Sequence, residues 1–316
     1  MSSIPKIIHQ TWKSRDLPDN YKNYSNSWKD KHPDWEYCFY DDIDCENFVK
    51  EFFPQFLEIY NSMEKPVMKA DMFRYLVVYK YGGVYADIDT LCLKSLNDLL
   101  DDSQMIVGID LDFNNKLLRF SPMYKYYKKN NINKQYAQYI FMSTIKNPIL
   151  LEVVENISQN NLDSNQHINV FLKTGPGIFT KIVDKYVKKK YPIKVLDIKA
   201  FNGVDNILER YIWGNNKTDP SSYIKHNEDA SWKDKNSIIY TFITILIISL
   251  FISIIVFFIY GIIYYFKCKK RGRKCLNKKI YCRIKIILLI LSNITFLILL
   301  IILINFFIQD RAYWPF

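Results

Sequence analysis

Histidine and cysteine are scarce in this sequence of 316 residues, which holds four histidines and six cysteines. Zinc sites draw on these residues at short, regular spacings, and no two cysteines here form a CxxC pair. A hydrolase with two metal ions usually needs more histidine and carboxylate ligands than this chain clusters. The composition therefore argues against a structural zinc site and against a phosphodiesterase-like metal hydrolase.

Two long segments lack charge altogether. Residues 238–266 and 286–309 contain no Asp, Glu, Lys or Arg. A helix needs about 20 apolar residues to cross the hydrocarbon core of a bilayer, and both segments are long enough. Buried core helices are the alternative, but these are usually shorter and carry a polar stripe. We expect two transmembrane helices, which anchor the chain in a membrane.

A basic stripe with interleaved aromatic residues, typical of nucleic-acid binding, is missing from residues 1–237. The net charge is +11, but ten lysines and arginines, with no acidic residue, stand at 267–285 between the two expected spans. Anionic lipid headgroups, and not nucleic acid, are the expected partner of this basic loop. Its cysteines, Cys268, Cys275 and Cys282, are either palmitoylated or plain thiols.

A signal peptide is also missing, since residues 1–6 lead straight into a strand-like run. We expect a globular domain at 1–237, transmembrane helices at 238–266 and 286–309, a basic loop at 267–285 and a short tail at 310–316. The positive-inside rule places the loop in the cytosol and the domain in a lumen, although 237 residues rarely cross a membrane without a signal peptide. In a lumen, Asn23, Asn156 and Asn216 would be glycosylation acceptors.

Strands and helices alternate within the globular domain. Apolar runs predict strands at 6–12, 35–40, 84–88, 105–109, 138–143 and 195–198. Helices are predicted at 21–31, 66–81, 149–158 and 178–189, and two short ones on either side of Pro54. The alternation indicates an α/β fold with a largely parallel sheet.

Two carboxylates follow the double glycine in YGGVYADIDT, residues 81–90. On an extended segment alternate side chains share a face, so Asp87 and Asp89 would point the same way with Ile88 buried opposite. Like charges side by side repel, and a divalent cation such as Mg²⁺ or Mn²⁺ removes that cost. The cation could clamp a diphosphate, and Gly82 and Gly83 would let a ligand approach the backbone closely. The alternative is an exposed strand end with two solvated acids.

The segment 66–80, PVMKADMFRYLVVYK, is a predicted helix that begins at a proline and ends before the double glycine. Asp71 and Arg74 lie three residues apart and share one face of it. Most of the remaining helix is apolar or aromatic, so the pair is expected to be half-buried. Either it is a plain ion pair within the helix, or both side chains bind the sugar or phosphate of a substrate.

Several of these motifs occur together in a known family. The runs IPKIIHQTW (4–12), KADMFRY (69–75) and GGVYADID (82–89), with WEYCFYDD at 35–42, resemble the glycosyltransferases that contain the DXD sugar-binding region. The resemblance runs from about Ile4 to Leu96, resumes at Thr174-Gly-Pro and ends at His226 and Ser231-Trp232. It implies a GT-A, Rossmann-like nucleotide-sugar-binding domain that transfers a hexose with retention of configuration.

The resemblance also implies roles for individual residues. Asp87 and Asp89 would be the catalytic DXD acids and would bind Mn²⁺ or Mg²⁺ with His226 as a further ligand. The residues that would contact the nucleotide-sugar donor are Thr11, Trp12, Asp71, Arg74, Gly83, Ser231 and Trp232. Taken alone, His226 could be a surface histidine, Trp12 a core residue and Trp232 an interfacial membrane anchor.

The resembling family includes mannosyltransferases, so GDP-mannose is the expected donor, with a UDP-hexose as the alternative. A site beside a bilayer favours a lipid acceptor such as inositol phosphoceramide over a glycan, in the Golgi or endoplasmic reticulum. A regulatory subunit remains a possible partner. A catalytically degenerate membrane scaffold is the competing interpretation, but the intact acidic residues and Arg74 speak against it.

Overall fold

The computed structural model divides the chain into two compact units, Met1–Glu228 and Asp229–Phe316. It describes residues 3–114, 122–159, 167–203 and 218–227, all within the first unit. The strands are β1 (Ile7–Thr11), β2 (Glu36–Tyr40), β3 (Gly83–Ala86), β4 (Thr90–Cys92), β5 (Met105–Asp112), β6 (Lys134–Ser143), β7 (Ile193–Leu196) and β8 (Ile224–His226). The α-helices are α1 (Asp19–Lys31), α2 (Asp42–Phe52), α3 (Leu57–Ser62), α4 (Pro66–Tyr81), α5 (Pro122–Lys129), α6 (Pro148–Gln159), α7 (His167–Lys173), α8 (Pro176–Lys188) and α9 (Ile198–Asn202).

The described strands confirm the α/β class but correct the expected sheet. One sheet has the order β2-β1-β3-β6-β5-β7, and a small second sheet pairs β4 with β8. Strand β6 runs antiparallel to both β3 and β5, so the sheet is mixed and not largely parallel. The connection from β5 to β6 returns at the same end of the sheet, and its described residues include the short helix α5, whereas a parallel pair needs a crossover that passes over a face.

Helix α4 begins and ends as its sequence predicts. Pro66 occupies the first turn, where its missing N–H costs nothing, and the helix ends at Gly82 with a positive φ of 67°. Asp41 and Asp44 form a reciprocal capping box that starts α2. The predicted strands 6–12, 35–40, 105–109 and 138–143 and the predicted helices all have counterparts, with ends shifted by a few residues.

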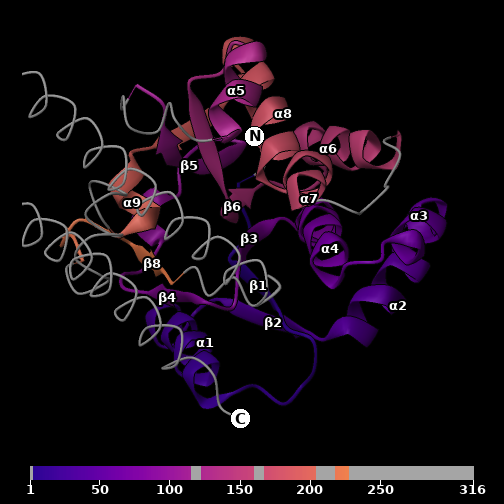
Figure 1. Cartoon of the computed structure of the whole chain (residues 1–316). Helices are drawn as coiled ribbons and strands as arrows, with labels where there is room; N and C mark the ends of the chain where they lie inside the picture. The colour runs from indigo at the N-terminus through magenta and orange to yellow at the C-terminus, as the bar shows by residue number, and fades with distance from the viewer. Residues whose placement is uncertain (1–2, 115–121, 160–166, 204–217, 228–316) are drawn as a thin grey trace, which may run out of the picture. The chain divides into compact units, whose positions relative to one another are not determined.

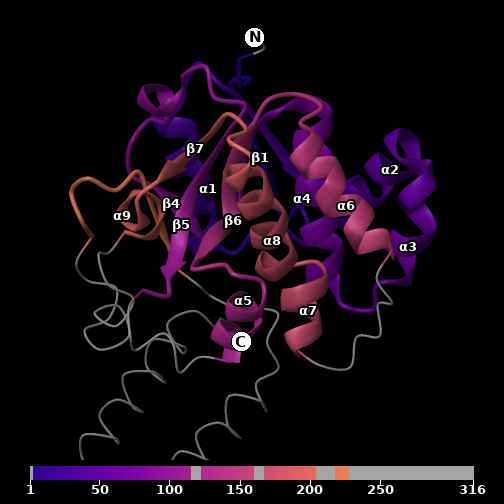
Figure 2. The ribbon, with the colours of Figure 1, turned by 90° about the horizontal axis from the view of Figure 1, so that it is seen from above.

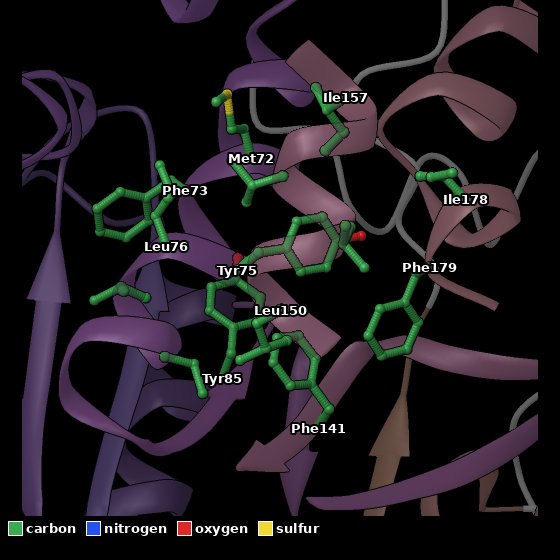
Figure 3. Close-up of a cluster of buried hydrophobic side chains, with 14 of the residues drawn as sticks. Met72, Phe73, Tyr75, Leu76, Tyr85, Phe141, Leu150, Ile157, Ile178 and Phe179 are labelled. Atoms are coloured by element: carbon green, nitrogen blue, oxygen red, sulfur yellow. The ribbon is translucent and has the colours of Figure 1, made fainter. Parts of the chain in front are cut away.

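Helices cover both faces of the large sheet (Figure 1). Helices α4, α6 and α8 pack on one face, where Tyr75 of α4 stacks against Phe179 of α8 and Phe141 of β6 (Figure 3). On the other face, α1 lies against β4 and α9 lies against β5, and their core includes Trp28 and Phe201 (Figure 2). Burying these two apolar layers is the main source of stability of such a fold.

Strands β1 and β3 are parallel, so their carboxyl ends, Thr11 and Ala86, lie at one edge of the sheet. The amino-terminal half of β6 and the carboxyl-terminal half of β5 reach the same edge, because β6 is antiparallel to its neighbours. Ligands of open α/β sheets bind outside the carboxyl ends of parallel strands. This edge therefore holds the residues that matter for function.

No helix among the described residues is long and apolar enough to cross a bilayer. The two expected spans, 238–266 and 286–309, lie outside the described residues.

Candidate active site and metal centre

The acidic pair stands on a turn and not on a strand. Strand β3 ends at Ala86, the Asp87 N–H donates to Tyr139 O at 2.8 Å, and the Thr90 N–H closes the turn on Asp87 O at 3.1 Å. The expected strand at 84–88 was therefore too long. Because the turn curves the backbone, it brings the carboxylates of Asp87 and Asp89 to one side, as the alternation argument had predicted for a different reason.

His226 reaches the acidic pair through the small sheet. Strand β8 pairs with β4 so that His226 lies opposite Thr90. The next residue, Asn227, donates from its backbone N–H and from Nδ2 to Asp89 O, both at 3.1 Å. As a result, His226 Nε2 lies 3.4 Å from Asp89 Oδ1.

Asp87, Asp89 and His226 each offer one ligand atom, and these atoms all lie within 4.8 Å of one another. Their side chains are 26%, 15% and 13% exposed, so the group is reachable but recessed. Two carboxylates and an imidazole suit Mn²⁺ and, less specifically, Mg²⁺. Among the described residues this is the one group of at least three such side chains. The residues therefore fit the expected divalent cation.

The electrostatics of the group also favour a cation. Burial raises the pKa of Asp87 to about 6, while the nearby Arg74 lowers it and the adjacent carboxylate of Asp89 raises it again. Asp71 and Asp87 share the guanidinium of Arg74, and Asp89 adds a third carboxylate beside Asp87. A divalent ion at the acidic pair would offset the excess negative charge.

Arg74 joins helix α4 to the acidic turn. Its guanidinium lies 3.1 Å from Asp71 Oδ1 and 3.3 Å from Asp87 Oδ1, and it donates to Gln138 O at 3.3 Å. Asp71 in turn accepts from Gln138 Nε2 at 2.9 Å and from Thr174 Oγ1 at 2.8 Å. Asp71 is 3% exposed and Arg74 5%, so the pair expected to be half-buried is fully buried behind the acidic turn.

Thr11 and Trp12 lie at the carboxyl end of β1, at the same edge of the sheet as Asp87. Thr11 Oγ1 lies 3.0 Å from the hydroxyl of Tyr85, and the Trp12 ring lies 4.5 Å from that of Tyr21. Trp12 Nε1 is buried and has no hydrogen-bond partner in the part of the chain that the structure describes. The predicted donor contact of both residues stays a prediction.

Gly83 is required by packing against β1, and its predicted contact with the donor stays a prediction. Its φ is 92°, and a Cβ there would lie 2.4 Å from Ile7 O on β1. Ser231 and Trp232, the remaining predicted donor residues, lie outside the described residues.

Several supporting residues were not anticipated. Tyr139 stacks on His226 at 3.9 Å between ring centroids. Gln10, which is fully buried, donates to Asp87 O at 3.2 Å. A glutamine inside the apolar run IIHQTW was the available signal for Gln10, whereas nothing local to the sequence marks Tyr139.

Comparison with known proteins finds similarity to glycosyltransferases. Residues 18–106 match the family described as "Glycosyltransferase sugar-binding region containing DXD motif". An initiation-specific alpha-1,6-mannosyltransferase of Candida albicans is 29% identical over 288 residues, which cover 73% of this chain and 72% of that protein. Inositol phosphoceramide mannosyltransferase 1 of Schizosaccharomyces pombe is 28% identical and covers 75% of this chain and 68% of that protein. The solved PaToxG glycosyltransferase is 18% identical, covers 59% of this chain and 71% of that chain, and has a TM-score of 0.44.

The acidic turn and these sequence similarities define a glycosyltransferase. More particularly, residues 18–106 match the sugar-binding region of the DXD-motif glycosyltransferases, and Asp87-Ile-Asp89 is the D-x-D sequence within that region. The family resemblance and the enzyme class predicted from the sequence are confirmed.

Proposed function

We propose that this chain is a metal-dependent, retaining mannosyltransferase of GT-A architecture that transfers mannose from GDP-mannose to a membrane lipid such as inositol phosphoceramide. The convergence of three ligand atoms from Asp87, Asp89 and His226 within 4.8 Å carries the metal-dependent part of this proposal. Support for mannose comes from the relatives, whose names include an alpha-1,6-mannosyltransferase and an inositol phosphoceramide mannosyltransferase.

Asp87, Asp89 and His226 would hold Mn²⁺ or Mg²⁺, which when bound supplies Lewis-acid stabilisation for a departing nucleoside diphosphate. Arg74 fixes the Asp87 carboxylate through paired contacts, so the ligand needs little reorganisation. The Tyr139 ring restricts the His226 imidazole, and the two Asn227 hydrogen bonds hold the backbone of Asp89. Such supporting contacts keep metal ligands in position.

The membrane part of the proposal comes from the sequence. The uncharged segments 238–266 and 286–309 would anchor the enzyme in the Golgi or endoplasmic reticulum with the catalytic domain in the lumen. An anchored active site would meet acceptors that are themselves confined to the bilayer. A glycan acceptor and a regulatory subunit are compatible with the same site.

The test uses the full chain in detergent with a panel of nucleotide sugars, Mn²⁺ and a nucleotide-release assay. We expect release from GDP-mannose, loss of release with EDTA, and loss of release in Asp89→Ala. The matched control is Asp98→Ala, which removes an exposed carboxylate elsewhere in the domain. Release from a UDP-hexose alone would contradict the donor, and failure to bind any nucleotide sugar would favour a scaffold.

A further inference from the structure

A second polar cluster lies at the same edge of the sheet, and its carboxylate is not among the proposed metal ligands. Its centre is Asp110 on β5, which is half-buried. Gln135 Nε2 donates to Asp110 Oδ2 at 2.6 Å, and Asn202 Nδ2 lies 3.3 Å from Asp110 Oδ1. Gln135 is 5% exposed and Asn202 2%, so two buried amides hold one carboxylate that is more exposed than they are.

The chemistry of the cluster fixes the orientation of both amides. An ionised carboxylate only accepts hydrogen bonds, so each amide must present its NH₂ group to Asp110. The amide oxygens then accept from tyrosine hydroxyls: Tyr127 donates to Gln135 Oε1 at 3.0 Å and Tyr139 donates to Asn202 Oδ1 at 3.1 Å. The carboxylate is therefore held in one position by two side chains that are themselves fixed.

Strand register places Asp110 at the same edge of the sheet as the acidic turn. Tyr85 of β3 and Val107 of β5 both pair with Phe141 on β6, which lies between them. Asp87 follows Tyr85 by two residues, and Asp110 follows Val107 by three. The register of β5 against β6 shifts between Val107 and Ile109 and again between Ile109 and Leu111, so Asp110 lies two strands from β3, toward the edge that carries the acidic turn.

The cluster shares a side chain with the metal centre. Tyr139, whose ring stacks on His226, also donates to Asn202 and to Phe201 O at 3.2 Å. Tyr139, Asn202 and Asp110 therefore lie on the face of the sheet that carries α9, which is also the face on which His226 lies.

We infer that Asp110 is a saccharide-binding residue that accepts hydrogen bonds from ring hydroxyls of the substrate, in a subsite adjoining the metal centre. The inference rests on the proposed glycosyl transfer. Hydrogen bonds from hydroxyls to a carboxylate are short and about twice as strong as those between neutral groups. Since Gln135 and Asn202 already hold the carboxylate, binding needs no rearrangement of the protein. The hydroxyls belong either to the donor hexose or to a polyhydroxylated acceptor headgroup.

The test compares Asp110→Asn with the wild type and with Asp98→Asn. Asp98 is exposed and lies in the short 3-10 helix that precedes β5, so this variant is a matched control. One arm measures hydrolysis of GDP-mannose with Mn²⁺ and no acceptor, and the other measures transfer to inositol phosphoceramide in detergent micelles. We expect KM to rise roughly tenfold or more in the arm whose substrate Asp110 binds. The affinity of the variant for GDP in the presence of Mn²⁺ should stay within about twofold of the wild-type value.

A raised KM for GDP-mannose hydrolysis assigns the hydroxyls to the donor, and a raised KM for the lipid alone assigns them to the acceptor. Unchanged KM values in both arms, or a parallel loss of GDP affinity, would overturn the inference while leaving the glycosyltransferase intact. A wild type that releases no nucleotide would overturn the proposed function and the subsite together. If Asp110→Asn does not fold, Asp110→Glu, which keeps the charge but displaces it, should raise the same KM.

Discussion

Both terminal nitrogens of Arg74 face the carboxylate of Asp87, with Nη2 3.3 Å from Oδ1 and Nη1 3.4 Å from Oδ2. The same Nη2 lies 3.1 Å from Asp71 Oδ1. One buried guanidinium thus neutralises acids on helix α4 and on the acidic turn. This arrangement makes the stability of the domain and the geometry of its active site depend on the same side chain.

Arg74→Leu is expected to destabilise the domain by about 3–5 kcal/mol, because it leaves two carboxylates without their buried counter-ion. Urea unfolding of the full chain in detergent, followed by tryptophan fluorescence, measures the loss. The double variant Asp71→Leu/Arg74→Leu should recover part of it, since one stranded charge is then removed. A double variant less stable than Arg74→Leu would contradict this account.

Tyr139→Phe and Tyr139→Ala separate the two roles of Tyr139. The phenylalanine keeps the ring against His226, so Mn²⁺ affinity should stay near that of the wild type. The alanine frees the imidazole and should weaken Mn²⁺ binding by about 10–100-fold, as loss of supporting contacts does at other metal sites. Calorimetric titration of Mn²⁺ into each purified variant gives the comparison, and equal affinities would show that the stack is not needed.

Binding of Mn²⁺ should weaken steeply below pH 6. Burial holds the pKa of Asp87 at about 6, and the carboxylate must be ionised to bind a metal. Below that pH each further unit should lower the affinity by about tenfold, because one proton competes with the ion. Titrations at pH 5 and 7 test this, and a flat profile between them would exclude Asp87 as a ligand.

Without metal, the stability of the domain should fall as the pH rises, whereas the affinity for Mn²⁺ should increase. The folded pKa of Asp87 lies above its ordinary value of 3.8, so the folded state binds more protons than the unfolded state between these values. The stabilising contribution of this group is fully present below pH 3.8 and is lost as the pH rises through about 6. In thermal melts with EDTA, the melting temperature should fall more between pH 5 and pH 7 for the wild type than for Asp87→Asn.

Gly83→Ala should be much more damaging than Gly203→Ala. Both glycines have positive φ, 92° and 77°, which costs an alanine about 1–2 kcal/mol. At Gly83 the new Cβ would also lie 2.4 Å from Ile7 O, whereas at Gly203 the nearest atom is 3.5 Å away. Denaturant midpoints of the two variants give the comparison, and equal shifts would show that β1 moves aside easily.

Local rules explain what the sequence could reveal. Helix α4 begins at Pro66 and is followed by the double glycine that starts at Gly82. Both signals act through backbone geometry, so they mark the ends of the helix without tertiary information. The closeness of Asp87 and Asp89 was predicted from alternation along an extended segment, but a turn produces it. By contrast, the antiparallel course of β6 depends on where the chain returns after β5, which no local pattern encodes.

The rest of the site consists of contacts between distant segments. The helix spacing predicted that Asp71 and Arg74 would meet, but not that Arg74 would also hold Asp87. His226 was proposed from the family resemblance and not from its own surroundings, and the pairing of β8 with β4 supplies the physical reason for its position. Tyr139 and Asn202 had no signal, because a tyrosine in a strand and an asparagine at a helix end have many ordinary uses.

Asn227 binds the backbone of Asp89 across 138 positions of sequence, and the small sheet that makes this contact is completed by the last strand described. During synthesis on the ribosome the two acids emerge long before the imidazole does. A partly synthesised chain would bind a divalent cation weakly, through the carboxylates of Asp87 and Asp89 alone. In the proposed enzyme, tight binding of the ion would therefore require the chain to be made at least as far as Asn227.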